Sequence, residues 1–370
     1  MDDRLATLYL LPPPASTSWA GTPGQTIQST IVRQKRDPLT LDLPLFWYDP
    51  RWCELPTSQA DDLAVAVSRH NILVSALRSD LSGPDVKTDF HAPQSAADSD
   101  SKGENADDKA ESTTEEPTYF PRIVPYRPER YGLSPKDFDH ATIIDVRLMM
   151  PRDTSGRFAY SPEQIARWES KNPSDAETDG SWVPAATFPP DVDSFEKLSS
   201  KLNQLRQLAP SAAVFTSIGP FRLEQEVPLA VAAKPDGLIV RLDQVALEPL
   251  QLAALTRRAR QLINDANGKK VPLWIVPGEI TADDAVKLVA LGADAIGIDA
   301  WCNPLLDVPD TGRSHYSSSV DFDDLADDAL TERLERFSGL YLSLQRVPVK
   351  ERLGSFSATW ARTLAVRALR

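Results

Sequence analysis

The sequence is poor in the residues that mark several common classes of protein. It contains only two cysteines, Cys53 and Cys302, and four histidines in 370 residues. Two cysteines are too few for a disulfide framework or an iron–sulfur cluster, and no histidine–cysteine group has zinc-ligand spacing. The sequence therefore predicts a reduced compartment, no iron–sulfur cluster and no metal site of the zinc type.

Long apolar runs and positive charge are scarce as well. No run approaches the roughly twenty apolar residues of a membrane helix, and the acidic start MDDRLATLYLLPPP lacks the basic region of a signal peptide. The net charge of −13 disfavours nucleic acid and anionic membrane surfaces as partners. We expect a cytoplasmic protein whose partner is a small molecule or another protein.

Composition divides the chain into three parts. Residues 1–40 show little periodicity and predict an extended N-terminal arm. Residues 41–305 alternate between apolar strand-like runs and helical segments, interrupted at 82–117 by an acidic, polar stretch that is expected to be disordered. Residues 306–370 predict a C-terminal helical extension, with helices over Asp323–Gln345 and about Val349–Leu369.

The stretch Val271–Asp299 shows how the central part is organised. A short apolar strand ends at Pro277-Gly278, Thr281 supplies a helix N-cap, and Gly292 stops the helix before a second apolar strand. Strand, helix and strand with short connections predict parallel strands joined by a right-handed crossover. The alternative is an ordinary strand–helix–strand unit that binds no ligand.

The number of strand-like runs predicts a closed barrel. There are eight: Leu41–Tyr48, Ile72–Leu77, Tyr119–Tyr126, Thr142–Leu148, Ala213–Ile218, Gly237–Leu242, Leu273–Val276 and the run after Gly292. Eight parallel strands with helices between them are what a (β/α)8 TIM barrel requires.

Four segments, in the right order, resemble one family. They are Arg130–Leu148 (RYGLSPKDFDHATIIDVRL), Pro189-Pro190-Asp191 with the helix that follows, the unit Val271–Asp299, and LDLPLFWYDP near the first strand. Together they are similar to the FMN-binding synthase domain of glutamate synthase. The resemblance covers most of residues 25–305 and implies an α/β barrel of the FMN-linked phosphate-binding type.

The resemblance also implies where FMN would bind. The family holds the phosphate with backbone amides after strands seven and eight, and the corresponding positions are Gly278, Glu279, Gly297, Ile298 and Asp299. Glu279 and Asp299 stand where the family has glycines, and two carboxylates would repel a phosphate dianion. A substrate-binding lysine of the family's fifth strand falls at Thr216, and the cysteines of its 3Fe–4S cluster are missing. We therefore expect FMN binding in the family's manner to be lost unless the two carboxylates turn away.

The strand ends supply candidate catalytic residues. Asp145, Arg147 and Asp243 lie near the ends of strands four and six, and with Glu279 and Asp299 they would converge where barrel enzymes keep their sites. Such carboxylates could bind a divalent cation or an amine, or share a proton as an acid/base pair. Alternatively, they form ion pairs with Arg147 and Arg241 and close the mouth of the barrel.

Three functions remain open from the sequence. In the first, a glutamate-synthase-like barrel has lost the flavin and iron–sulfur redox reaction. It binds a small molecule, or it contacts a protein partner through the barrel and the acidic stretch 82–117. In the second, it is an oxidoreductase or an enzyme subunit in glutamate biosynthesis with altered FMN binding. In the third, it is a metal-dependent enzyme that uses the acidic mouth.

Overall fold

A computed structural model describes most of the folded chain. It covers residues 2–13, 27–34, 36–52, 55, 57–77, 120–126, 133, 135–148, 159–160, 183–184, 189, 191–192, 194–307 and 321–370. The acidic stretch 82–117 lies outside these residues, so its predicted disorder stays a prediction.

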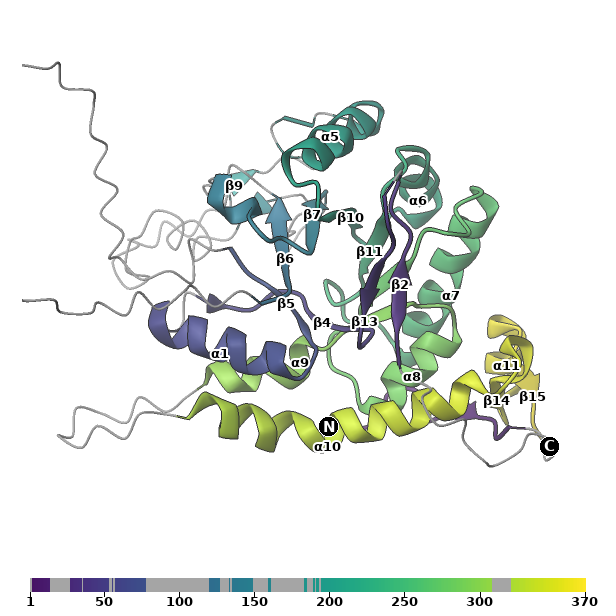
Figure 1. Ribbon diagram of the computed structural model, residues 1–370. Coiled ribbons are helices and arrows are strands. Elements are labelled where there is room, and N and C mark those ends of the chain that lie inside the picture. The colour runs from purple at the N-terminus through teal and green to yellow at the C-terminus, as the bar shows by residue number, and fades with distance from the viewer. Residues whose placement is uncertain are drawn as a thin grey trace, which may run out of the picture.

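Eight parallel strands form a closed barrel (Figure 1). In barrel order they are β4 (Leu45–Trp47), β5 (Leu73–Ser75), β6 (Arg122–Tyr126), β7 (Ile143–Arg147), β10 (Ala213–Ile218), β11 (Gly237–Arg241), β12 (Leu273–Val276) and β13 (Ala295–Gly297). The ring closes where β13 pairs with β4, with Ile296 beside Leu45. The predicted (β/α)8 barrel is confirmed, and all eight strands fall within the segments that the sequence indicated.

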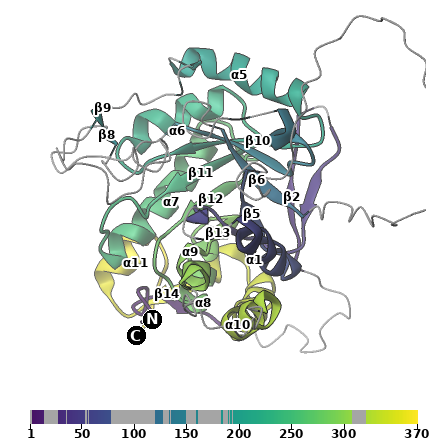
Figure 2. The same cartoon turned by 90° about the vertical axis from the view of Figure 1, so that its left-hand side faces the viewer.

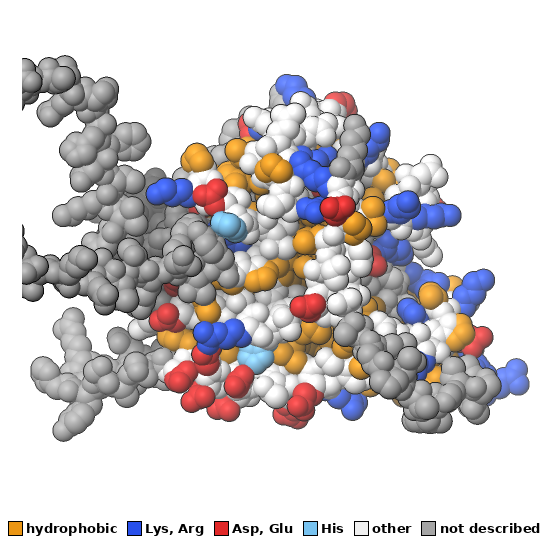
Figure 3. Space-filling model, viewed as in Figure 1, with side chains coloured by type: hydrophobic (Ala, Val, Ile, Leu, Met, Phe, Trp, Pro, Cys, Tyr) orange, Lys and Arg blue, Asp and Glu red, His pale blue; other side chains and the backbone are white. Residues whose placement is uncertain are grey.

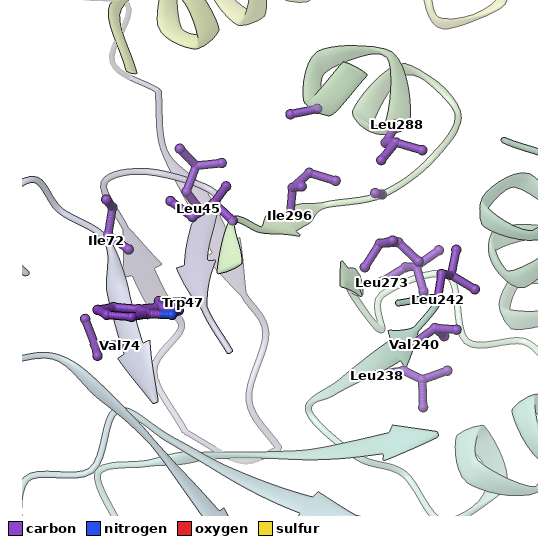
Figure 4. Close-up of a cluster of buried hydrophobic side chains, with 14 of the residues drawn as sticks. Leu45, Trp47, Ile72, Val74, Leu238, Val240, Leu242, Leu273, Leu288 and Ile296 are labelled. Carbon is purple, nitrogen blue, oxygen red and sulfur yellow. The ribbon is translucent and has the colours of Figure 1, made fainter. Parts of the chain in front are cut away.

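Each strand has two buried faces, which explains its nearly continuous apolar character. On β4, Phe46 faces the barrel interior, whereas Leu45 and Trp47 face the surrounding helices. Figure 4 shows part of this outer layer, in which Trp47 lies beside Val74. Inside the barrel, Trp274 packs against Phe46 and Phe215, with ring centroids 4.7 Å apart in both pairs.

Helices follow most of the strands. They are α1 (Thr57–Arg69), α5 (Phe195–Leu208), α6 (Leu223–Ala232), α7 (Pro249–Asp265) and α8 (Ala282–Ala290). The predicted cap at Thr281 is present, because its side chain accepts a hydrogen bond from the backbone N–H of Asp284. Between β6 and β7 the described residues contain only a short 3-10 helix, η2 (Pro135–Phe138).

The N-terminal segment contains more structure than an extended arm. Strands β2 (Ser29–Ile31) and β3 (Leu39–Leu41) form an antiparallel hairpin. Ile31 is fully buried and belongs to the interior cluster of the barrel. Arg33 and Arg36 donate to the carbonyls of Ser211 and Pro210, just before β10, so the hairpin closes the amino-terminal end of the barrel.

After β13 the chain forms α9 (Asp299–Cys302) and η3 (Asn303–Leu306), and the described part of the C-terminal extension begins with the long helix α10 (Phe322–Gln345). Helix α10 packs against α8 and α1 (Figure 2). Asp323, Asp324, Asp327 and Asp328 of this helix are exposed. In Figure 3, acidic side chains gather at the lower left, over the region that α10 occupies in Figure 1.

The single helix predicted over about Val349–Leu369 is wrong. The chain forms η4 (Val349–Glu351), β14 (Leu353–Ser355), α11 (Ala358–Leu364) and β15 (Arg367–Ala368) instead. Strand β14 pairs with β1 (Tyr9–Leu10), a partner almost the whole chain away, and Ser357 caps a new helix. A second small pair, β8 (Ala159–Tyr160) with β9 (Val183–Pro184), lies between β7 and α5 in the sequence.

None of the helices in the described part of the chain combines the length and apolar character needed to cross a membrane.

Candidate functional site

Two of the predicted candidates, Asp145 and Arg147, face the interior at the carboxyl end of β7. They alternate with Val146 and share the side of Ile143, which belongs to the interior apolar cluster. Asp145 is fully buried, and the side chain of Arg147 is 5% exposed. Asp243 is the second residue after β11, so all three candidates lie at the barrel mouth.

Asp145 is the centre of a buried hydrogen-bond network. Its Oδ2 lies 2.8 Å from the hydroxyl of Tyr48, which also lies 2.8 Å from Ser217 Oγ. Ser217 donates to Asp145 Oδ1, and Arg147 Nε donates to Oδ2 at 3.1 Å. Burial raises the pKa of Tyr48 well above its ordinary value, so its hydroxyl stays protonated and can donate. These donors offset the cost of burying the Asp145 charge.

The two arginines of the mouth, Arg147 and Arg241, both stack on the ring of Tyr48. The guanidinium carbons of Arg147 and Arg241 lie 4.3 and 4.7 Å from the centroid of the Tyr48 ring. Arg147 also donates to Tyr48 O at 2.9 Å and to Ser75 Oγ at 3.1 Å. Arg241 makes a two-pronged ion pair with Asp243, with Nε 2.6 Å from Oδ1. Both ion pairs of the alternative prediction, Asp145 with Arg147 and Asp243 with Arg241, are therefore present.

Asp49 joins these two ion pairs. Its Oδ1 accepts from Arg147 Nη1 at 3.3 Å, and its Oδ2 accepts from Arg241 Nη1 at 3.4 Å. The Asp49 side chain is 51% exposed, whereas those of the two arginines are almost buried. Although desolvation raises the pKa of Asp49, Arg241 and Arg147 lower it below its ordinary value, so the carboxylate is charged at neutral pH.

The positions implied for the FMN phosphate lie after β12 and β13. Gly278 has a φ of +78°, a left-handed turn that favours glycine. Glu279 is exposed, and its backbone carbonyl accepts from Arg4 Nη1 at 3.1 Å. Gly297 and Ile298 are buried, and the N–H of Ile298 donates to Phe46 O at 2.9 Å.

Asp299 turns toward the end of the first barrel strand. Its carboxylate accepts from the backbone N–H of Asp49 at 2.7 Å and of Tyr48 at 3.3 Å. Burial raises the pKa of Asp299 to about 7, and the charges of Asp49 and Asp243 act in the same direction. Asp299 Oδ2 also lies 3.3 Å from the point that a Cβ on Gly297 would occupy.

This arrangement does not fit a phosphate dianion. The mouth holds four carboxylates, those of Asp49, Asp145, Asp243 and Asp299, against the two guanidinium groups of Arg147 and Arg241. The backbone amides of Tyr48 and Asp49 already donate to a carboxylate of the same chain. The residues of the mouth therefore do not supply the net positive charge that would balance a phosphate dianion.

A metal site receives no support from the described residues. Among them, no group of three or more histidine, cysteine, aspartate or glutamate side chains could hold a metal ion. The carboxylates of the mouth instead face arginines or backbone amides.

The sequence interpretation missed several residues of this site. Tyr48 and Asp49 directly follow β4. Their position at a strand end is the one feature of the sequence that could have indicated a role at the mouth. At Thr216 the expected substrate-binding side chain is absent from the mouth, because Phe215 and Ser217 face the interior and Thr216 shares the outer side with Val214. Ser217 is therefore the fifth-strand residue that reaches the network.

A cavity of about 500 Å³ lies elsewhere, between β6, η2 and α5. It is lined by Tyr126, Leu133, Phe138, Lys201, Gln204, Leu205, Gln207 and Leu208. Lys201 there donates to Asp191 at 2.6 Å. The cavity contains none of the predicted site residues.

Solved structures with the same fold include flavin enzymes. A flavocytochrome b2 variant with benzoylformate is 11% identical, with a TM-score of 0.52, and the match covers 99% of this chain and 79% of that one. Another variant with pyruvate bound is 12% identical, with a TM-score of 0.50 and the same coverage. A mandelate oxidase structure is 12% identical, with a TM-score of 0.47, and covers 91% of this chain and 83% of that one. Mandelate oxidase is also known with an FMN adduct.

At such identities the likeness shows a barrel fold that FMN-binding enzymes use, and it does not single out glutamate synthase. No protein-family model and no curated protein matches the sequence.

Proposed function

We propose that this protein is a glutamate-synthase-like barrel that binds a small molecule at its mouth and does not carry out flavin redox chemistry. The observation that carries the proposal is the inward-turned carboxylate of Asp299, which accepts from the backbone amides of Tyr48 and Asp49. It stands at a position where the family needs glycine. The rest of the mouth carries more carboxylates than guanidinium groups, and Asp145 and Asp243 form ion pairs with Arg147 and Arg241.

The balance of energies supports the same conclusion. Two unit charges 4 Å apart repel by about 1 kcal/mol in water and by about 4 kcal/mol at an effective dielectric near 20. A hydrogen bond from an amide to a charged acceptor contributes about 1.5–3 kcal/mol. At the higher of these figures, a phosphate beside one ionised carboxylate would meet repulsion as large as the gain from one or two amides.

The visible spectrum of the purified protein tests this proposal. We expect no flavin absorbance and no rise in melting temperature with added FMN, because a ligand of the native state must stabilise it. The matched variant Asp299→Gly restores the family's residue and shows whether Asp299 prevents FMN from binding. Stoichiometric flavin in the wild-type protein, or an FMN-dependent rise in its melting temperature, would overturn the proposal.

A second candidate is an FMN-dependent oxidoreductase, favoured by the fold shared with flavocytochrome b2 and mandelate oxidase. Gly278 and Gly297 are retained at two of the family's phosphate positions, which also favours it. In that case the protein would be purified yellow, and lactate or mandelate would bleach the flavin absorbance without oxygen. A protein partner for the acidic stretch 82–117 stays a prediction from the sequence.

A further inference from the structure

The side chain of Arg4, near the start of the chain, joins two loops of the barrel mouth. Its Nη1 donates to the backbone carbonyls of Pro277 at 3.2 Å and Glu279 at 3.1 Å, and its Nη2 donates to that of Leu247 at 2.8 Å. Pro277 and Glu279 lie between β12 and α8, and Leu247 lies between β11 and α7. Both connections follow the carboxyl ends of their strands, so one guanidinium group fastens two neighbouring loops of the mouth.

Helix α8 holds the backbone on either side of this guanidinium group. The fully buried carboxylate of Asp284 accepts from the N–H groups of Arg4 at 3.0 Å and Leu5 at 2.7 Å. Three residues further along the helix, Lys287 donates to the carboxylate of Asp3 at 2.7 Å and to the carbonyl of Leu5 at 3.0 Å. Because these contacts already fix the backbone, the Arg4 side chain needs little further ordering to reach the loops.

The turn that Arg4 holds packs against Asp243. The two carbonyls that accept from Arg4 Nη1 flank Gly278, and the point that a Cβ on Gly278 would occupy lies 3.6 Å from Asp243 Cβ. The N–H of Asp243 donates to Val276 O at 3.0 Å, so the two loops are also joined at their start. Asp243 then forms the two-pronged ion pair with Arg241. A contiguous set of contacts therefore leads from Arg4 to the mouth.

We propose that Arg4 is a positioning residue of the mouth. By joining the loops after β11 and β12, it fixes the place of Asp243 and, through the ion pair, the orientation of Arg241. The inference rests on the proposed function, since these loops border the place where that function puts a small molecule. A guanidinium group suits this role, because its planar fork donates to several carbonyls at once in a fixed geometry.

NMR of the full chain without ligand tests the inference. In Arg4→Ala, the amide of Asp243 should exchange with solvent at least about tenfold faster, the factor that corresponds to the loss of about one hydrogen bond from the closed loop. The side-chain ¹⁵Nε resonance of Arg241 should also shift. Arg33→Ala is the matched control, because Arg33 likewise donates to backbone carbonyls, but at the opposite end of the barrel. It should leave both signals of the mouth unchanged.

A second variant, Arg4→Lys, keeps the positive charge and replaces the fork with one ammonium group. It should change both signals in the same direction but by less, and it decides the question if Arg4→Ala does not fold. Unchanged Asp243 exchange and Arg241 resonance in every Arg4 variant that folds would overturn the inference, as would equal changes in Arg33→Ala. Neither result bears on FMN, whose binding to the wild-type protein tests the proposed function separately.

Discussion

The carboxylate of Asp299 accepts a 2.7 Å hydrogen bond from the backbone N–H of Asp49, 250 residues earlier in the chain. The bond ties the segment after the last barrel strand to the segment after the first. It therefore positions Asp49, whose side chain bridges Arg147 and Arg241. One carboxylate at the family's phosphate position thus supports the hydrogen-bond network of the mouth.

Stability should fall as pH rises through neutrality because of Asp299. Its pKa of about 7 in the folded protein is above its ordinary value of 3.8. The stability that its protonated form contributes is fully present below about pH 4 and is lost as pH rises through 7. A difference of about three pKa units corresponds to about 4 kcal/mol as an upper limit. Urea unfolding at pH 5 and pH 8 measures the part of this loss that remains above pH 5, about 3 kcal/mol as an upper limit.

The free energy of unfolding of Asp299→Asn should fall less between pH 5 and pH 8 than that of the wild-type protein, because asparagine resembles the protonated acid and does not ionise. Glu279→Gln, a change at an exposed neighbour on the next loop, should keep the wild-type pH dependence. Parallel pH profiles for wild type and Asp299→Asn would contradict the assignment.

Removal of the Asp284 carboxylate should destabilise the protein by about 3 kcal/mol or more. This fully buried side chain accepts from the N–H groups of Arg4 at 3.0 Å, Leu5 at 2.7 Å and Thr281 at 3.1 Å. Each buried donor left without an acceptor costs about 1–3 kcal/mol. Chemical unfolding of Asp284→Ala measures the loss, and the adjacent, more exposed Asp283→Ala should change stability by less than about 1 kcal/mol.

Ile31→Ala should open the amino-terminal end of the barrel. Ile31 is fully buried in the interior cluster, and an isoleucine-to-alanine change in a core costs about 2–5 kcal/mol. Thr30→Ala, on the exposed side of the same strand, is the control and should cost less than about 1 kcal/mol. Equal melting temperatures for the two variants would show that the hairpin does not close the barrel.

Tyr48→Phe should destabilise the protein by about 1.5–3 kcal/mol, because a buried carboxylate loses a hydrogen-bond donor. The hydroxyl lies 2.8 Å from Asp145 Oδ2, and Asp145 has no exposure to water that could replace it. The half-exposed Tyr9, changed to phenylalanine, is the control. Thermal unfolding compares the two, and a loss no larger than that of Tyr9→Phe would contradict the network described for Asp145.

The sequence by itself determined the barrel, because strands and helices are specified by periodic patterns of apolar residues and by the residues at their ends. Apolar runs at regular spacing fixed all eight strands, and Thr281 and Gly292 marked the ends of helix α8, since caps and stops depend on neighbouring residues. The same periodicity placed Asp145 and Arg147 on one side of β7. It failed over Val349–Leu369, where pairing of β14 with the distant β1 outweighs a helical pattern.

Only the tertiary structure decided what the mouth of the barrel contains. Closure of β13 on β4 brings Asp299 to the amides of Tyr48 and Asp49, and it places Asp49 between arginines from β7 and β11. Such contacts join residues that are 98 to 250 positions apart. Whether a carboxylate at a strand end meets a ligand, an arginine or a backbone amide depends on the direction of its side chain in the closed ring, and spacing along the chain does not encode that direction.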